Sequence, residues 1–241
     1  IANNLANVNT TGFKRSRVNF QDVLYETIQG ERIVRQPGAE STGPIQIGKG
    51  VRVAGVTRLD AQGSPESTQR PLDVAIEGQG YLQVQRPDGT VGYTRDGSLS
   101  LSESGTLVTS SGYPVLPGVT VPQDATDITI GPSGIVSVTA AGSSGPVEIG
   151  RIELARFLNP GGLMAVGENL LVATEASGEP VTGLPQDDGF GRLVQGALEA
   201  SNVEIVQEMT DMIAAQRAYE INAKAIKAGE EMMQITNEIL R

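Results

Sequence analysis

Residues 201–241 constrain the fold of this chain more than any other stretch. They hold no proline and one glycine, Gly229. A narrow stripe repeats through them at intervals of seven residues, which is the pattern of a coiled-coil helix. A helix of roughly 39 residues spans about 58 Å, so we expect much of the stripe to meet another helix. The alternative is an ordinary terminal helix packed on its own domain. The stripe comprises Ile205, Met209, Met212, Ile213, Gln216, Tyr219, Ala223, Ile226, Met233 and Leu240.

The start of this helix carries its own signal. Ser201, Asn202, Val203 and Glu204 match a capping box, in which the Ser201 hydroxyl bonds forward and the Glu204 carboxylate reaches back. The sequence therefore predicts that the helix begins directly after Ser201.

Composition excludes several classes of function. The chain has no Cys and no His, so common zinc sites and Ser-His-Asp or Cys-His nucleophiles are ruled out. The net charge of −10 disfavours nucleic-acid binding. Glycine is abundant and aromatic residues make up 4%, which favours turn-rich β structure over an aromatic-lined pocket. We expect no cofactor, no metal, no nucleic acid and no small-molecule substrate. Because the chain begins at Ile1, we expect further residues upstream.

The N-terminal segment predicts a short helix. Ile1, Leu5 and Val8 share one helical face, and Gly12 suits the left-handed position that ends a helix. The other faces carry Asn, which is a poor helix former, so they are expected to contact something. The basic run that follows has two interpretations, a solvated turn or a contact to an acidic neighbour. It comprises Lys14, Arg15 and Arg17.

Residues 18–33 are mixed in pattern and fit either a short helix or the start of a strand. Residues 36–50 are rich in Pro, Gly and Ser, which favours extended or irregular backbone. Alternation of Val51 and Val53 then begins β structure.

Residues 71–171 are predicted as strands and turns. Leu82 and Val84 alternate before a Pro-Asp-Gly turn, and alternation resumes afterwards, which predicts a hairpin. A second hairpin is predicted around the turn at residues 131–134. The apolar phase shifts by one residue beside Gly150, which predicts a β-bulge.

The sequence shows no arrangement of residues that is typical of a catalytic site. Asp187-Asp188 and Glu230-Glu231 are sequence neighbours that point apart, unlike the facing carboxylates of a glycosidase. The glycine-rich residues 77–80 lack the third glycine and the helix of a dinucleotide loop. We therefore expect no enzyme.

Helices at opposite ends of a chain can pair with each other. The predicted fold is mixed α and β, with the N- and C-terminal helices paired as a coiled-coil inner domain, an inserted antiparallel β domain and an extended β arm. The expected segments are residues 1–24 for the N-terminal helix and turn, 25–70 for the arm, 71–195 for the β domain and 196–241 for the C-terminal helix.

Three stretches closely resemble signatures of the flagellar basal-body rod and hook family. The N-terminal pattern is matched at Asn4, Ala6, Asn7, Thr10, Gly12, Phe13 and Lys14. Residues 72–81 and 93–98 match in the middle, and residues 201–224 match at the end. Within the family the chain is most similar to the distal-rod members, with the proximal-rod members as the close alternative.

The resemblance implies a structural subunit of the distal rod. Such subunits assemble helically into a stiff hollow tube that surrounds an export channel, crosses the periplasm and transmits motor torque to the hook. Export by the flagellar type III apparatus is implied as well. The implied partners are further copies of the chain, proximal-rod proteins, the hook protein and the surrounding P- and L-ring proteins.

Periodicity and resemblance together give the candidate interface residues. The self-assembly interface is expected at Leu5, Val8, Phe13, Ile205, Met209, Met212, Ile213, Gln216, Tyr219, Ala223, Ile226, Met233 and Leu240. The resemblance turns the loose segment before Gly50 into an arm that braces neighbouring subunits. Its candidate residues are Pro37, Gly38, Pro44, Ile45, Ile47 and Lys49.

Two other classes stay open at this point. A secreted adhesin-like binding module would share the acidic charge, the lack of Cys and the turn-rich middle, and it would bind a ligand through the β loops. A carbohydrate-processing enzyme would need two carboxylates that converge from distant parts of the sequence.

Overall fold

The computed structural model describes residues 1–29, 44–140 and 145–239. The chain divides into two compact units, one formed by Ser16–Leu59 and the other by Ile1–Arg15 together with Asp60–Arg241. The four-part division expected from the sequence stays a prediction.

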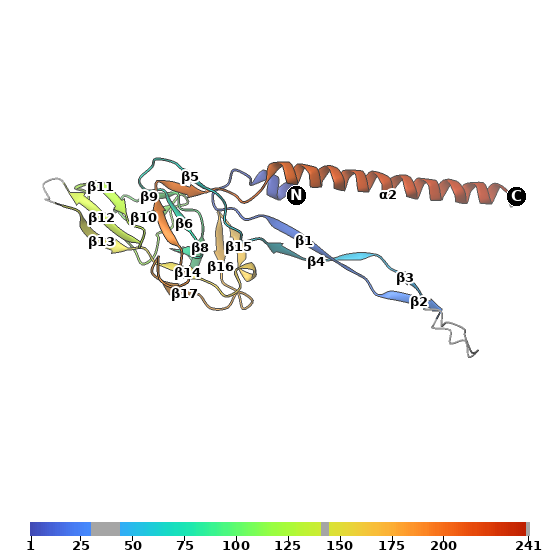
Figure 1. Cartoon of the computed structure of the whole chain (residues 1–241), viewed down its shortest axis with the longest axis horizontal. Coiled ribbons are helices and arrows are strands. Elements are labelled where there is room, and N and C mark those ends of the chain that lie inside the picture. Colours follow the sequence, from blue (N-terminus) through green and yellow to red (C-terminus); the bar gives the residue numbers. More distant parts are fainter. Residues whose placement is uncertain (30–43, 141–144, 240–241) are drawn as a thin grey trace, which may run out of the picture. The chain divides into compact units, whose positions relative to one another are not determined.

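The smaller unit consists of antiparallel two-stranded ribbons (Figure 1). Strand β1 (Ser16–Asp22) pairs with β4 (Val51–Arg58), and β2 (Tyr25–Gln29) pairs with β3 (Ile45–Gly48). The described part of the ambiguous stretch 18–33 is therefore strand. Apolar side chains of these strands stay exposed, since a single ribbon has no second layer to cover them. The exposed set is Val18, Phe20, Leu24, Tyr25, Ile28, Ile45, Ile47, Val51, Val53 and Val56.

The larger unit is built mainly from short antiparallel strands (Figure 1). Its largest sheet has six strands in the order β15-β16-β8-β7-β14-β17. A second sheet has the order β11-β12-β13, and three pairs join β9 to β10, β6 to β18 and β5 to β19. The strands are β5 (Pro65–Ser67), β6 (Val74–Glu77), β7 (Tyr81–Gln85), β8 (Val91–Thr94), β9 (Leu99–Leu101), β10 (Leu107–Thr109), β11 (Ala125–Ile130), β12 (Ile135–Ala140), β13 (Val147–Arg151), β14 (Leu154–Arg156), β15 (Met164–Gly167), β16 (Leu170–Val172), β17 (Val181–Gly183), β18 (Arg192–Gln195) and β19 (Ala197–Glu199). A 3₁₀ turn, η1 (Pro160–Gly162), precedes β15.

Both predicted hairpins are present, as β7–β8 and β11–β12. Gly89 and Gly134 supply the positive φ of their turns, at 81° and 83°. The predicted bulge is present too, because the β12–β13 register passes over Ile149 between Glu148 and Gly150. These features are confirmed because alternation and turn residues are local signals.

The hydrophobic core lies among the strands of the larger unit. Leu82, Val84, Leu99, Leu107 and Leu154 are fully buried there. A smaller aromatic cluster packs beside it, in which the Tyr93 and Phe157 rings meet edge to face at 4.7 Å between centroids. The rings of Tyr81 and Phe157 also meet edge to face, at 6.1 Å.

Helix α1 (Ala2–Ala6) has five residues and helix α2 (Ile205–Ile239) has 35. The expected fold class is therefore wrong, because the chain is mostly β and its terminal helices do not form a paired coiled coil. A five-residue helix extends only about 7.5 Å and can accompany no more than the first turns of α2. The physical reason lies in the Asn-rich segment, where the Asn7 side chain donates to the Asn3 carbonyl at 2.9 Å as α1 ends.

The predicted start of the C-terminal helix is wrong as well. Residues 201–204 are not helical, and α2 begins at Ile205. The Ser201 hydroxyl accepts from the Val203 amide at 3.3 Å, two residues on, so it closes a local turn. The Asn202 side chain binds the Arg15 amide and the Ala61 carbonyl instead.

Candidate assembly surfaces and the ionic junction

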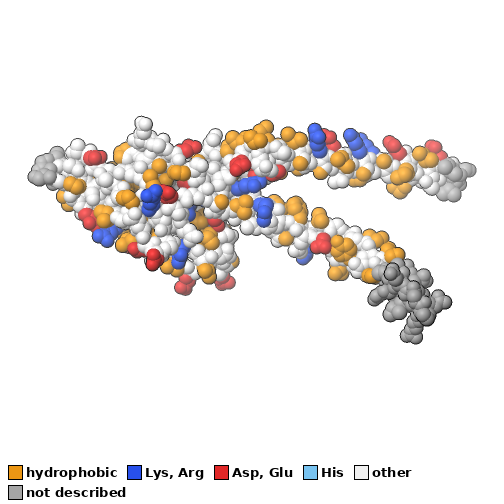
Figure 2. Space-filling view, viewed as in Figure 1, with side chains coloured by type: hydrophobic (Ala, Val, Ile, Leu, Met, Phe, Trp, Pro, Cys, Tyr) orange, Lys and Arg blue, Asp and Glu red, His pale blue; other side chains and the backbone are white. Residues whose placement is uncertain are grey.

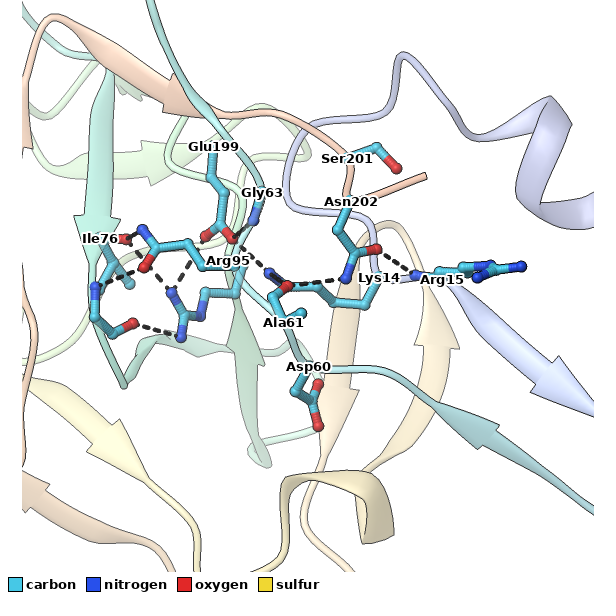
Figure 3. Close-up of polar contacts among 12 residues, drawn as sticks. Lys14, Arg15, Asp60, Ala61, Gly63, Ile76, Arg95, Glu199, Ser201 and Asn202 are labelled. Carbon is cyan, nitrogen blue, oxygen red and sulfur yellow. Dashed lines mark hydrogen bonds and ion pairs between the residues drawn. The ribbon is translucent and has the colours of Figure 1, made fainter. Parts of the chain in front are cut away.

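A buried ionic junction lies where the N-terminal segment, the β strands and the residues just before α2 meet (Figure 3). Its centre is Glu199, at the end of β19, which is 1% exposed. Its Oε1 accepts from the Lys14 ammonium at 2.5 Å and from the Gly63 amide at 2.9 Å. Its Oε2 accepts from the Arg95 guanidinium at 3.2 Å. Two buried cations therefore share one buried carboxylate.

Arg95 is held by several further contacts. Its Nη2 donates to the Gly78 carbonyl at 2.8 Å, and its guanidinium lies 5.2 Å from the centre of the Tyr81 ring. These contacts hold the cation between the bend that follows β6 and the ring of Tyr81 on β7, so the position of Glu199 is fixed relative to the core.

The backbone around Glu199 is close-packed. Gly12 has a φ of 67°, and its amide donates to the Glu199 carbonyl at 2.8 Å. A Cβ at Gly12 would lie 2.7 Å from the Arg95 carbonyl carbon, and one at Gly63 would lie 1.9 Å from the Ala200 carbonyl oxygen. Glycine at these two positions is what lets three segments converge.

Asn202 extends the junction toward α2. Its Oδ1 accepts from the Arg15 amide at 2.7 Å, and its Nδ2 donates to the Ala61 carbonyl at 2.8 Å (Figure 3). Lys14 donates to the same Ala61 carbonyl, also at 2.8 Å. The residues just before α2 are thus bound to both the N-terminal segment and the segment that leads into β5.

A second polar contact ties α1 to α2. Glu208, in the first turn of α2, is 1% exposed and accepts from Asn4 at 3.1 Å and from the Arg15 Nε at 2.5 Å. Arg15 also contacts Asp211 at 3.3 Å. The basic run Lys14-Arg15 therefore meets acidic neighbours, and the solvated-turn interpretation is wrong for these two residues. Arg17 is exposed.

Burial sets the electrostatics of the junction. Desolvation lowers the pKa of Lys14 below its ordinary 10.5, and the hydrogen bond and charge of Glu199 oppose that shift. The junction is therefore held together by the mutual attraction of Glu199 with Lys14 and Arg95. It fixes where α2 leaves the β strands.

Beyond its first turns, α2 leaves its apolar seam uncovered, and Figure 2 shows hydrophobic side chains along it. Tyr219 is 77% exposed, and Ile226 and Met233 are each 65% exposed. Ile205, Met209, Ile213 and Gln216 are exposed as well, whereas Met212 and Ala223 are half-buried. Leu5, Val8 and Phe13 are half-buried in the N-terminal segment. Leu240 lies outside the described residues. Their role as an interface stays a prediction.

The candidate arm residues are likewise uncovered where they are described. Ile45 and Ile47 on β3 are 55% and 54% exposed, and Pro44 is exposed. The Lys49 ammonium pairs with Glu26 of β2 at 3.0 Å. Pro37 and Gly38 lie outside the described residues.

The sequence did not identify Glu199, Arg95 or Glu208 as site residues. One signal for Glu199 was present, because strand alternation puts it on the same face as buried Ala197. A charged residue on a buried face requires a partner, but its two cations lie 104 and 185 positions away. Spacing alone could not identify them.

Within residues 1–29, 44–140 and 145–239, no cluster of three or more acidic side chains is arranged to hold a metal ion. In the same ranges, no helix combines the length and apolar character needed to cross a membrane.

Three family models match the chain. The flagellar basal body rod protein model matches residues 1–14, the flagellar hook protein FlgE/F/G D1 domain model matches residues 75–138, and the flagellar basal body rod FlgEFG protein C-terminal model matches residues 194–239. The first ends at Lys14 and the last begins just before Glu199, so both termini of the junction lie within matched regions.

Similarity to individual proteins extends over the full chain. The flagellar basal-body rod protein FlgG of Caulobacter vibrioides is 48% identical, over 99% of this chain and 92% of that protein. The FlgG of Borreliella burgdorferi is 48% identical over 100% of this chain and 92% of that protein. The FlgG of Bacillus subtilis is 40% identical over 97% of this chain and 89% of that protein. The chain therefore belongs to the FlgG family of flagellar basal-body rod proteins.

Proposed function

We propose that this chain is a structural subunit of the flagellar distal rod, which self-assembles helically into a stiff hollow tube that transmits torque to the hook and surrounds an export channel. The full-length similarity to FlgG proteins supports this role over an adhesin-like module or a proximal-rod protein. The role is mechanical and uses no cofactor.

The observation that carries the proposal is the apolar seam that α2 leaves exposed. Burying one large apolar side chain stabilises a contact by about 1.5–3 kcal/mol. Tyr219, Ile226 and Met233 follow one another at intervals of seven and are all more than half exposed. A single chain does not cover these side chains within its described residues. Contacts between copies that are heterologous and do not close would cover them and propagate a filament.

The finer placement follows from the same family membership. The rod would cross the periplasm, after export of its subunits by the flagellar type III apparatus. Proximal-rod proteins would adjoin it at one end and the hook protein at the other, with P- and L-ring proteins around it. The ionic junction would hold α2 at a fixed angle to the β strands, which a torque-bearing shaft requires.

Electron microscopy of the purified protein at rising concentration tests the proposal, with straight tubular filaments as the expected result. Ile226→Asp should abolish filaments, because a charge would be buried in the contact. Its matched control is Thr210→Asp, which adds the same charge at an exposed α2 position off the seam. Normal filaments from the Ile226 variant, with loss in the control, would exclude the seam as the contact.

The arm has a separate test. Ile45 and Ile47 lie on one face of β3, and Gln46 lies between them on the other. If the arm braces neighbouring subunits, Ile45→Ser with Ile47→Ser should give filaments that bend more, measured as a shorter persistence length in micrographs. Gln46→Ser should leave the persistence length unchanged. Equal stiffness in all three filaments would remove the bracing role.

A further inference from the structure

One leucine of the larger unit is almost entirely uncovered. Leu158, which follows β14, is 97% exposed. Its two neighbours in the sequence are both held in place. Phe157 is buried in the aromatic cluster, and the Asn159 side chain donates to the Ala176 carbonyl at 2.9 Å. Leu158 therefore extends into solvent from a backbone that is fixed on both sides.

The loop after Leu158 is close-packed as well. A Cβ at Gly162 would lie 2.6 Å from the Ala176 carbonyl carbon, and the Thr174 hydroxyl donates to the Gly162 carbonyl at 2.6 Å. Ser177 is 1% exposed, and its hydroxyl donates to the Thr174 carbonyl at 2.8 Å. A side chain that is already held in one place loses little conformational freedom when it binds, so Leu158 is suited to a contact.

An arginine two residues before Leu158 has no acidic partner. Residues 60–200 hold six arginines. Five of them contact a carboxylate, namely Arg70, Arg86, Arg95, Arg151 and Arg192. The sixth, Arg156, pairs with no carboxylate of the described residues, although acidic side chains outnumber basic ones in this region. Its guanidinium lies 5.6 Å from the centre of the Phe190 ring.

Arg156 and Leu158 together form one small surface. Two residues of extended backbone span about 7 Å, so a cation lies close to an exposed apolar side chain. We call this surface the Arg156–Leu158 knob. Its chemical complement is an apolar pocket with a carboxylate at its rim, because opposite charges across a contact fix which surfaces meet.

A pocket of this character lies beside β9 in the same unit. Its volume is about 210 Å³, and its apolar lining comprises Leu101, Val121, Pro122, Ala125 and Ile128. Glu103 also lines it, is exposed, and pairs with no cation of the described residues. The Val121 amide donates to the Gly105 carbonyl at 2.8 Å, which joins the two loops that form the pocket.

We infer that the Arg156–Leu158 knob of one copy binds the pocket beside β9 of a second copy, with Leu158 on the apolar lining and Arg156 beside Glu103. The knob and the pocket are different surfaces, so each copy can bind one neighbour through each of them. Such heterologous contacts propagate a filament, and in this respect the inference rests on the proposed function.

Two other pockets fit the knob less well. One has a mainly polar lining that includes Arg70, which would repel Arg156. The other includes Glu66, but its apolar lining is limited to Val8, Leu198 and Ala200. Charge and apolar lining together therefore favour the pocket beside β9.

Disulfide trapping in the purified full-length protein tests which surfaces meet. The chain has no cysteine, so the introduced thiols have no native competitor. Leu158→Cys mixed with Ala125→Cys should give a disulfide-linked dimer, because the two thiols together take the place of the leucine side chain. One chain that carries both changes should give a ladder of oligomers, since a heterologous contact does not close. Leu158→Cys mixed with Ser110→Cys is the control and should stay unlinked, because Ser110 is exposed but lies outside the pocket.

Charge reversal tests the pairing through the lowest protein concentration at which filaments form. Arg156→Glu alone, or Glu103→Arg alone, should raise this concentration by about fivefold or more, because an attraction becomes a repulsion. The chain with both changes should return to the wild-type value, since every contact then holds the same pair reversed. Arg151→Glu is the matched control, because Arg151 is exposed and lies outside the knob.

Removing the apolar side chain tests the pocket itself. Leu158→Ser should raise the same concentration by more than about tenfold, because burying a leucine side chain contributes at least that much to a contact. The urea midpoint should stay at the wild-type value, since Leu158 is uncovered in the single chain.

The outcomes separate this contact from the proposed function. Filaments without the mixed disulfide, or a double charge variant that assembles no better than the single variants, would overturn the inference and leave the proposed function standing. A mixed disulfide without filaments would retain the contact and overturn the proposed function. Equal linkage to Ser110→Cys would overturn the inference, and the absence of both filaments and the mixed disulfide would overturn both.

Discussion

Replacing Glu199 with Gln should destabilise the larger unit more than any other single isosteric change of a carboxylate. The Glu199 carboxylate is the shared counter-charge of Lys14 and Arg95, whose side chains are 4% and 8% exposed. Glutamine keeps the size of the side chain but removes that charge. The NH2 group of glutamine would also face the Lys14 ammonium, the Gly63 amide or the Arg95 guanidinium, all of which are hydrogen-bond donors.

The magnitude follows from burial. Removing one partner of a buried ion pair costs about 3–5 kcal/mol, because the remaining charge has no compensation. With a urea dependence of about 2 kcal/mol per molar, the unfolding midpoint should fall by roughly 1.5–2.5 M. Fluorescence of the tyrosines, among them buried Tyr81 and Tyr93, reports this unfolding in a chain without Trp.

Glu77→Gln is the matched control. Glu77 pairs with Arg192 at 2.7 Å, but its side chain is 47% exposed. An exposed ion pair contributes at most about 1 kcal/mol, so the midpoint should move by no more than roughly 0.5 M. If Glu199→Gln shifts the midpoint no further than Glu77→Gln does, the buried-anchor account is refuted.

Two further predictions concern backbone and pH. Gly63→Ala should sharply lower the free energy of unfolding, because its Cβ would lie 1.9 Å from the Ala200 carbonyl oxygen. Gly229→Ala should instead raise the helix content of α2 in circular dichroism, because a Cβ at this position meets nothing within 4 Å. An unchanged urea midpoint for Gly63→Ala would contradict the first. Burial raises the pKa of Tyr93 above its ordinary 10.0, so its contribution to stability is complete below pH 10 and is lost as pH rises through the folded-state pKa. Tyr93→Phe should therefore flatten the decline of the unfolding free energy above pH 10, and an equal decline in both proteins would count against it.

The strands of the larger unit were predictable because their signals are local. In β7–β8, apolar side chains alternate on each side of a turn whose residues suit its dihedral angles, and pairing follows from that pattern. The bulge at Ile149 was visible as a change of phase. What alternation cannot give is the partner of a strand far away in sequence, such as β19 for β5 or β18 for β6.

The pairing of the terminal helices was predicted wrongly because two true signals were joined by an assumption. The long C-terminal helix and a helix in the N-terminal segment are both present, but the described α1 spans only Ala2–Ala6 and the two do not form a paired coiled coil. Its contact with α2 includes a hydrogen bond from Asn4 to Glu208, which lies in the first turn of α2.

The sequence by itself determined that a long helix follows residue 201, that it carries an apolar stripe, and that hairpins with glycine turns lie in the middle of the chain. These are properties of neighbouring residues, so their physical causes lie within a few positions. Only the tertiary structure decided that Lys14 and Arg95 share Glu199, and that glycine at positions 12 and 63 lets their segments meet there. Burying charge is favourable only when its counter-charge is buried with it, and which residues supply that counter-charge depends on how distant segments pack.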